Sequence, residues 1–304
     1  MNELLNKIIE KNKYLVNEGK VADYIPALSK VDSNHIGICI LDLKGNIYKS
    51  GNFDTPFTIQ SISKVMALAL AIMDNSEEKV FDKVGYEPTD EPFNTLYKLD
   101  LPYITKPSNP MINSGAIVTN DLIKGDGEEK FNRLLDFIRK VTENPDITYD
   151  EEVYLSEKST GHKNKAMAYL MKSRGMLDGN VEEILEGYFK QCSIKITSVD
   201  LAKIGLFLSN KGKLLGTREE ICSEKTISTI IAIMATCGMY NFSGEYAAKV
   251  GIPSKSGVAG GILGTVPGKM GIGIYSPALD KYGNSIVGYN IMKDISNELN
   301  LSVY

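Results

Sequence analysis

The segment Ser61-Ile62-Ser63-Lys64-Val65-Met66-Ala67-Leu68-Ala69-Leu70-Ala71-Ile72-Met73 joins a polar tetrapeptide to an uninterrupted apolar run. The apolar part carries no charge, which predicts a helix buried on all sides. It is too short to span a bilayer. Ser61 and Lys64 are three residues apart, so one helical turn places both side chains on the same face. We therefore expect a buried helix whose first turn presents a serine beside a lysine.

The position of Ser61 and Lys64 predicts a nucleophile beside its base. The preceding Thr58-Ile59-Gln60 is typical of an extended entry, which puts Ser61 at the helix N-terminus beside unpaired backbone N–H groups. Such groups can stabilise a developing oxyanion. Burial and the helix dipole both disfavour the ammonium form of Lys64, so its neutral amine could deprotonate Ser61. Alternatively, Ser61 only caps the helix, as serine commonly does.

Length, charge and cysteine content restrict the class of protein. A chain of 304 residues with 43% hydrophobic content can form a large core in one or two domains. The 34 basic and 38 acidic residues are interspersed and give a net charge of −4, so neither nucleic acid nor an anionic membrane is an expected partner. The four cysteines form no C-x-x-C pair and accompany no metal-ligand histidine spacing, which favours reduced thiols and no metal site.

The N-terminal segment indicates where in the cell the protein is located. Residues 1–11 are amphipathic and charged throughout, without the apolar core and cleavage site of a secretory signal. We therefore expect a cytoplasmic protein.

The two ends of the chain have mixed helix and strand patterns. An amphipathic helix is expected over residues 4–17, followed by strands at 35–41 and 47–48 that flank the hairpin turn Lys44-Gly45-Asn46. Near the other end, glycine, proline and a polar loop separate short apolar strands and suggest an antiparallel meander before a final helix. These strands are expected at 257–263, 270–275 and 285–289.

The middle of the chain is mainly helical. Apolar residues recur at helical spacing in five segments, at 131–141, 163–174, 181–190, 198–209 and 225–236. We predict an α+β fold in which residues 1–70 and 240–304 form one discontinuous sheet-containing domain. Residues 71–239 would form a mainly helical domain, with the active site between the two.

Two downstream segments could complete a serine nucleophile's site. Lys255-Ser256-Gly257 opens a glycine-rich strand, where small residues let a backbone N–H approach a substrate closely. Tyr240 ends Cys237-Gly238-Met239-Tyr240, and a tyrosine beside a lysine could pass protons between Ser61 and a leaving amine. The alternatives are a glycine-rich edge strand and a tyrosine that only packs.

Together, S-x-x-K, a downstream tyrosine and K-S-G resemble the signature of serine β-lactamases and penicillin-binding enzymes. A longer set of segments, in family order over roughly residues 20–290, resembles the serine-dependent glutaminases. These segments are Tyr24-Ile25-Pro26, Gln60-Ser61-Ile62-Ser63-Lys64, Asn109-Pro110-Met111-Ile112-Asn113-Ser114-Gly115-Ala116, Ser156-Glu157, Gly161-His162-Lys163-Asn164, Cys237-Gly238-Met239-Tyr240 and Lys255-Ser256-Gly257-Val258.

The resemblance implies a β-lactamase/transpeptidase-like fold, with an antiparallel sheet flanked by helices and a helical domain. It implies hydrolysis of L-glutamine to L-glutamate and ammonia, without metal or organic cofactor, by a homo-oligomer (dimer or tetramer). By the same resemblance, Ser61 is the nucleophile, Lys64 its base and Tyr240 the proton shuttle, and the N–H groups of Ser61 and Val258 form the oxyanion hole. The implied substrate contacts are Tyr24, Ser61, Asn113, Glu157, Asn164, Tyr188, Tyr240 and Val258.

These assignments suit the groups of glutamine. Glu157 would pair with the α-ammonium, and Asn113 and Asn164 would donate to the α-carboxylate. Taken alone, Glu157 lies in a charged stretch typical of a solvated face, and Asn113 is typical of a loop or helix cap. His162 lacks a Ser-His-Asp partnership, which favours a surface or supporting role. Asn241 stands where the family more often has aspartate, a change that bears on pH dependence.

Three functions remain open at this stage. The first is a glutaminase that forms an acyl-enzyme at Ser61. The second is a β-lactam or peptide acyl hydrolase of the same fold, which would need an export signal to meet its substrate. The third is a non-catalytic glutamine-binding protein, which the retention of Ser61, Lys64 and Tyr240 disfavours.

Overall fold

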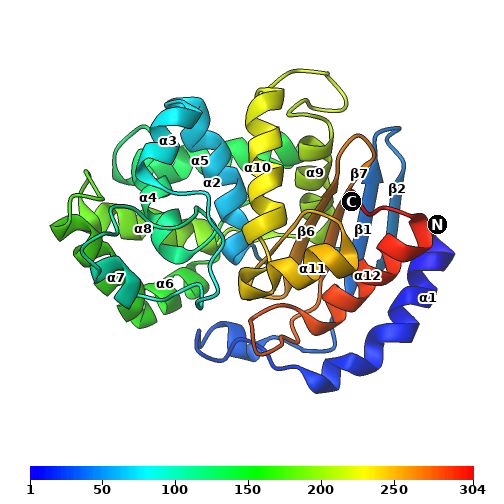
Figure 1. Cartoon of the computed structure of the whole chain (residues 1–304). Helices are drawn as coiled ribbons and strands as arrows, with labels where there is room; N and C mark the ends of the chain where they lie inside the picture. Colours follow the sequence, from blue (N-terminus) through cyan, green and yellow to red (C-terminus); the bar gives the residue numbers. More distant parts are fainter.

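The computed structural model describes residues 1–304 and contains one five-stranded antiparallel sheet and twelve α-helices (Figure 1). The strand order is β2-β1-β7-β6-β5, and every neighbouring pair is antiparallel. The strands span Gly37–Asp42 (β1), Ile47–Gly51 (β2), Ser254–Ser256 (β5), Gly261–Val266 (β6) and Met270–Tyr275 (β7). The two ends of the chain therefore share one sheet.

A second, two-stranded ladder pairs β3 (Phe57–Thr58) with β4 (Lys195–Ile196). It fixes the segment before Ser61 against the segment before α9. The α-helices are α1 (Asn2–Asn12), α2 (Ser63–Asp74), α3 (Glu77–Lys83), α4 (Asn113–Leu122), α5 (Gly127–Thr142), α6 (Glu151–Thr160), α7 (His162–Ser173), α8 (Val181–Cys192), α9 (Ser198–Ser209), α10 (Glu224–Cys237), α11 (Ser243–Val250) and α12 (Ile286–Leu299).

Short 3₁₀ helices fill several of the connections: η1 (Lys13–Glu18), η2 (Leu28–Lys30), η3 (Gln60–Ile62), η4 (Tyr97–Asp100) and η5 (Tyr240–Phe242). No single helix is long and apolar enough to cross a membrane, although α10 and the segment Tyr240–Val250, bent by 86°, reach that length and composition together.

The alternating sequence of β7 explains how helices cover both faces of the sheet. Ile272 and Ile274 belong to a core cluster shared with α1 and α12, which lie side by side on one face (Figure 1). On the other face, α9 approaches β7 so closely that a Cβ added at Gly273 would lie 2.1 Å from the Ser198 carbonyl oxygen. A Cβ added at Gly271 would be equally close to α9, at 2.1 Å from the Ala202 carbonyl oxygen. Glycine at alternate positions therefore seats α9 on the strand.

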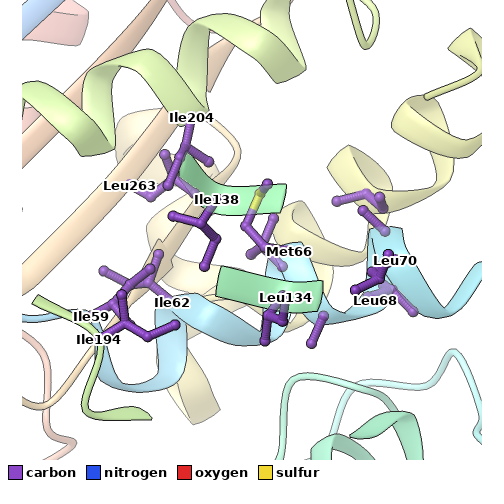
Figure 2. Close-up of a cluster of buried hydrophobic side chains, with 14 of the residues drawn as sticks. Ile59, Ile62, Met66, Leu68, Leu70, Leu134, Ile138, Ile194, Ile204 and Leu263 are labelled. Atoms are coloured by element: carbon purple, nitrogen blue, oxygen red, sulfur yellow. The ribbon is translucent and has the colours of Figure 1, made fainter. Parts of the chain in front are cut away.

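Helix α2 is the centre of the largest core cluster. Every residue from Ser63 to Ile72 is buried, and α4, α5 and α10 pack around it. Figure 2 shows Met66 of α2 beside Leu134 and Ile138 of α5. The prediction of a helix buried on all sides is confirmed as far as Ile72, whereas Met73, also in the predicted run, is exposed. In Figure 1, α2 lies between the sheet and the outer helices α3 to α8.

Most predicted elements are confirmed, including the hairpin, β7 and all five central helices. The predicted strand at 285–289 is wrong, because Ser285 accepts a hydrogen bond from the Gly288 N–H and caps α12. The predicted strand at 257–263 begins only at Gly261, since a turn closed by the Gly260 N–H and the Gly257 carbonyl precedes it. The expected first helix changes to 3₁₀ geometry after Asn12.

The division into residues 1–70 with 240–304 and residues 71–239 stays a prediction. Helix α9 falls inside the second range, yet it packs on β1, β6 and β7. The sheet therefore takes one covering helix from the middle of the chain.

Replacing Gly273 by alanine should destabilise the fold, because the new methyl group would overlap the Ser198 carbonyl oxygen of α9. We expect the free energy of unfolding, measured by urea denaturation, to fall by about 1–3 kcal/mol. The matched control is Gly244→Ala in α11, where an added Cβ has no neighbour within 4 Å. An alanine variant at Gly273 as stable as the control would contradict this description of the helix–sheet contact.

Candidate active site

A cavity of about 320 Å³ collects the predicted substrate-contacting residues. Its lining includes all of the predicted site residues except Lys64 and Tyr240. Tyr24 is 55% exposed and lies at the mouth, whereas Ser61 is 7% exposed. The predicted residues in the lining are Tyr24, Ser61, Asn113, Glu157, Asn164, Tyr188 and Val258.

Ser61 lies in the 3₁₀ turn η3 that leads directly into α2. The turn begins with Gln60, whose φ of 50° lies in the left-handed region that few non-glycine residues adopt. The Ser63 hydroxyl donates to the Gln60 carbonyl at 2.7 Å and stabilises this turn. The strained backbone therefore places Ser61 at the cavity wall, with α2 starting behind it.

Lys64 is almost completely buried in the first turn of α2. Its Nζ donates to Asn113 Oδ1 at 2.7 Å and to the Met111 carbonyl at 3.2 Å, and it forms no ion pair within 4.0 Å. Burial lowers the pKa of Lys64 to about 8, although Cys192 and Glu157 oppose the shift. A substantial fraction of the amine is therefore neutral near pH 8, as a general base requires.

Tyr240 begins the turn η5 that follows α10, and its φ of 55° is also left-handed. Its hydroxyl donates to the Ser256 carbonyl at 3.4 Å, and its ring packs on Phe93 with a centroid distance of 4.7 Å. Burial raises the pKa of Tyr240 to about 12, and its neighbour Ser61 opposes this rise. The phenol is therefore a neutral hydroxyl close to Ser61. The adjacent Asn241 side chain is exposed.

Glu157 of α6 is 8% exposed, so its carboxyl is not on a solvated face. One carboxyl oxygen, Oε1, is buried without a hydrogen-bond partner. Burial raises the pKa of Glu157 to about 7, and Gln60 and Lys64 oppose the shift. A buried carboxylate with an unused acceptor is costly unless a cation or donor completes it. The cavity therefore contains a position suited to a small ammonium group.

The two asparagines are joined to each other and to Lys64. Asn113 begins α4 without capping it, and its Nδ2 donates to Asn164 Oδ1 of α7 at 3.0 Å. Its Oδ1 accepts from Lys64. The amide groups of Asn113 and Asn164 are neutral and can donate to a carboxylate. These hydrogen bonds link α2 to the wall of the cavity.

Val258 follows β5, and its backbone N–H donates to no acceptor within the protein. Tyr188 of α8 is buried, and burial raises its pKa well above the ordinary value, so it is a neutral hydroxyl. Neutral donors and a free N–H therefore face the same cavity as the carboxyl of Glu157.

Several lining residues were not predicted as site residues, among them Phe93, Cys192 and Gln60. Gln60 adjoins Ser61 in the sequence, which is a usable signal, whereas Phe93 and Cys192 carry none. His162 begins α7 with an exposed side chain at the cavity. The structure contains no cluster of three or more His, Cys, Asp or Glu side chains arranged to hold a metal ion.

A serine at a helix start, a buried amine and a free N–H thus lie at or next to one cavity. The glutaminase family model matches residues 19–304, and the chain belongs to the glutaminase family. The glutaminase of Clostridioides difficile is 53% identical over 302 residues, covering 99% of this chain and 98% of the relative. The glutaminase of Clostridium tetani is 53% identical over 305 residues, covering 100% of both chains.

Solved glutaminases share the whole fold. A Bacillus subtilis glutaminase in covalent complex with 5-oxo-L-norleucine has a TM-score of 0.91 and 38% identity, covering 100% of this chain and 99% of that chain. A Bacillus glutaminase in the presence of 4.3 M NaCl has a TM-score of 0.93 and 37% identity, with the same coverage. The predictions of a β-lactamase-like α+β fold and of a glutaminase enzyme are confirmed.

Replacing Glu157 by glutamine should make the stability of the protein less dependent on pH. The folded-state pKa of about 7 exceeds the ordinary value of 4.5, so the stability that the protonated carboxyl contributes is lost as pH rises through about 7. The free energy of unfolding of Glu157→Gln, relative to the native sequence, should therefore rise by on the order of 2 kcal/mol between about pH 4.5 and pH 8.

Chemical denaturation at a series of pH values measures this difference. Glu151→Gln is a matched control, since this glutamate lies exposed on the same helix. A difference between Glu157→Gln and the native sequence that stays constant with pH would contradict the environment described for this carboxyl.

Proposed function

We propose that this chain hydrolyses L-glutamine to L-glutamate and ammonia through an acyl-enzyme on Ser61. The observation that carries the proposal is the buried Lys64 amine, which has no acidic partner and lies one helical turn from Ser61. The covalent complex formed by a related glutaminase with a glutamine analogue supports a nucleophile in this family.

In the acylation half-reaction, the neutral Lys64 amine accepts the Ser61 proton as Oγ attacks the side-chain amide carbon of glutamine. The N–H groups of Ser61 and Val258 stabilise the oxyanion of the tetrahedral intermediate. The C–N bond then breaks, and Tyr240 delivers the proton that releases ammonia. Tyr240 regains a proton from the Lys64 ammonium, which leaves a γ-glutamyl ester on Ser61.

In deacylation, Lys64 again acts as the base, and water takes the place of Ser61 as the attacking group. A water molecule gives a proton to the neutral Lys64 amine and attacks the ester carbon. The second tetrahedral intermediate collapses, Ser61 recovers its proton, and glutamate leaves. One water molecule is consumed for each ammonia released, so the two half-reactions balance.

The cavity selects glutamine by its charged end. Glu157 supplies the acceptor for the α-ammonium, and Asn113 and Asn164 donate to the α-carboxylate. Tyr24 and Tyr188 line the space between these groups and the nucleophile. A substrate that lacks the ammonium group would leave the buried Glu157 carboxyl unpaired, and this penalty would weaken its binding.

Replacing Ser61 by alanine should lower kcat for glutamine by at least about 1,000-fold, because Ser61 is the only serine that lines the cavity. Ammonia and glutamate release are measured together, with L-asparagine and a chromogenic cephalosporin as parallel substrates. Ser228→Ala is the matched control, since Ser228 is an exposed serine on α10 whose hydroxyl donates only to the Glu224 carbonyl.

Near-native ammonia release by Ser61→Ala would reject the proposed mechanism. Turnover of the cephalosporin by the native protein would favour an acyl hydrolase of the other type. Binding of glutamine without any turnover would favour a binding protein.

A further inference from the structure

Lys255 is a second buried lysine that the proposed mechanism leaves unused. It lies in β5, has no exposed surface and forms no ion pair within 4.0 Å. Its Nζ donates to the Gly238 carbonyl at 2.9 Å and to the Ser256 carbonyl at 2.7 Å. The amine therefore joins the end of α10 to the edge strand of the sheet.

Both of these carbonyls lie next to groups of the candidate active site. Gly238 precedes Tyr240 by two residues, and Ser256 precedes Val258 by two residues. The Ser256 carbonyl also accepts the hydrogen bond from the Tyr240 hydroxyl at 3.4 Å. In addition, Lys255 Nζ lies 4.3 Å from the centroid of the Tyr240 ring. One amine thus contacts the phenol and the strand that presents the free N–H.

The surroundings of Lys255 do not favour a stabilising role. The titratable groups that face it are Lys64, Cys237 and Tyr240, and none is an acid at neutral pH. Burial and the like charge of Lys64 lower the pKa of Lys255 well below its ordinary value. Burying an amine without an acidic partner costs stability that an apolar side chain of similar volume would avoid. A role in the function of the protein is the simplest explanation for a lysine at position 255.

Another buried lysine of the same chain, Lys190, shows what a lysine with a structural role contacts. Lys190 of α8 is also mostly buried and lies over three aromatic rings at 5.8–5.9 Å, but two acids, Glu128 and Glu186, each lie 3.4 Å from its Nζ. It therefore has the acidic partners that a structural lysine needs, whereas Lys255 has two carbonyls and one aromatic ring but no acid.

We propose that Lys255 is a positioning residue for glutamine hydrolysis. Its two hydrogen bonds hold the Tyr240 turn against the Ser256–Val258 segment, so that the phenol and the Val258 N–H keep a fixed geometry about Ser61. The inference rests on the proposed function. The left-handed φ of 55° at Tyr240 explains why such a restraint is needed, because the turn would otherwise relax to a commoner conformation.

The test replaces Lys255 by methionine, which keeps the length of the side chain but removes both donors. We expect kcat for glutamine to fall by about 100-fold, since small displacements of reacting groups cost that much. KM should stay within about threefold, because Lys255 does not line the substrate cavity. The midpoint of thermal unfolding should be equal to or higher than that of the native protein.

Lys190→Met is the matched control, and it should lower the unfolding midpoint while kcat stays within about twofold of the native value. If Lys255→Met does not fold, Lys255→Gln is measured by the same criteria, since it keeps one donor on a shorter side chain. The inference is overturned if kcat stays within about threefold of native, or if kcat falls only together with the unfolding midpoint and with a parallel rise in KM.

Ser61→Ala is assayed beside these variants. If Ser61→Ala is inactive while the Lys255 variants keep the native kcat, the positioning role fails and the proposed function stands. If Ser61→Ala keeps activity, the proposed function fails and the positioning role, which depends on it, is withdrawn.

Discussion

The structure depends on one constraint, which is the burial of the Lys64 amine without an acidic partner. Helix α2 is apolar from Val65 to Met73, so it can be surrounded by α4, α5 and α10, and its first turn is buried with it. The packing that forms the core also removes water from Lys64 and lowers its pKa. A single stretch of sequence therefore determines both the centre of the fold and the buried environment of Lys64.

The sheet end of the molecule supplies another wall of the same cavity through Val258. Its edge strand β5 and the turn at Gly257–Gly260 bring Val258 to the cavity, and the seating of α9 on Gly271 and Gly273 holds the sheet against the core. Left-handed residues at Gln60 and Tyr240 flank Ser61 in space although 180 residues separate them in sequence. Strain at such positions is common where geometry serves chemistry.

Elements with long apolar periodicity could be predicted from the sequence, and short ones could not. The five central helices and β7 repeat a pattern over several turns or residues, whereas residues 285–289 offer too few positions to separate a strand from the start of α12. The candidate site residues were named from S-x-x-K and the family segments, and seven of them line one cavity. The partners of Lys255 could not be predicted, because a lysine bonded to distant carbonyls leaves no periodic signal. The cytoplasmic location, the homo-oligomeric state and the absence of nucleic-acid and membrane partners stay predictions.

The most direct test of the central claim is the pKa of Lys64 itself. Carbon-13 labelling of the lysine side chains and titration by NMR would follow each amine, with the Lys64→Arg and Lys255→Met variants assigning the two buried lysines. The account predicts a midpoint for Lys64 of about 8 in the resting protein. A midpoint at the ordinary value of 10.5 would mean that the amine is fully protonated at neutral pH, and would contradict its assignment as the base.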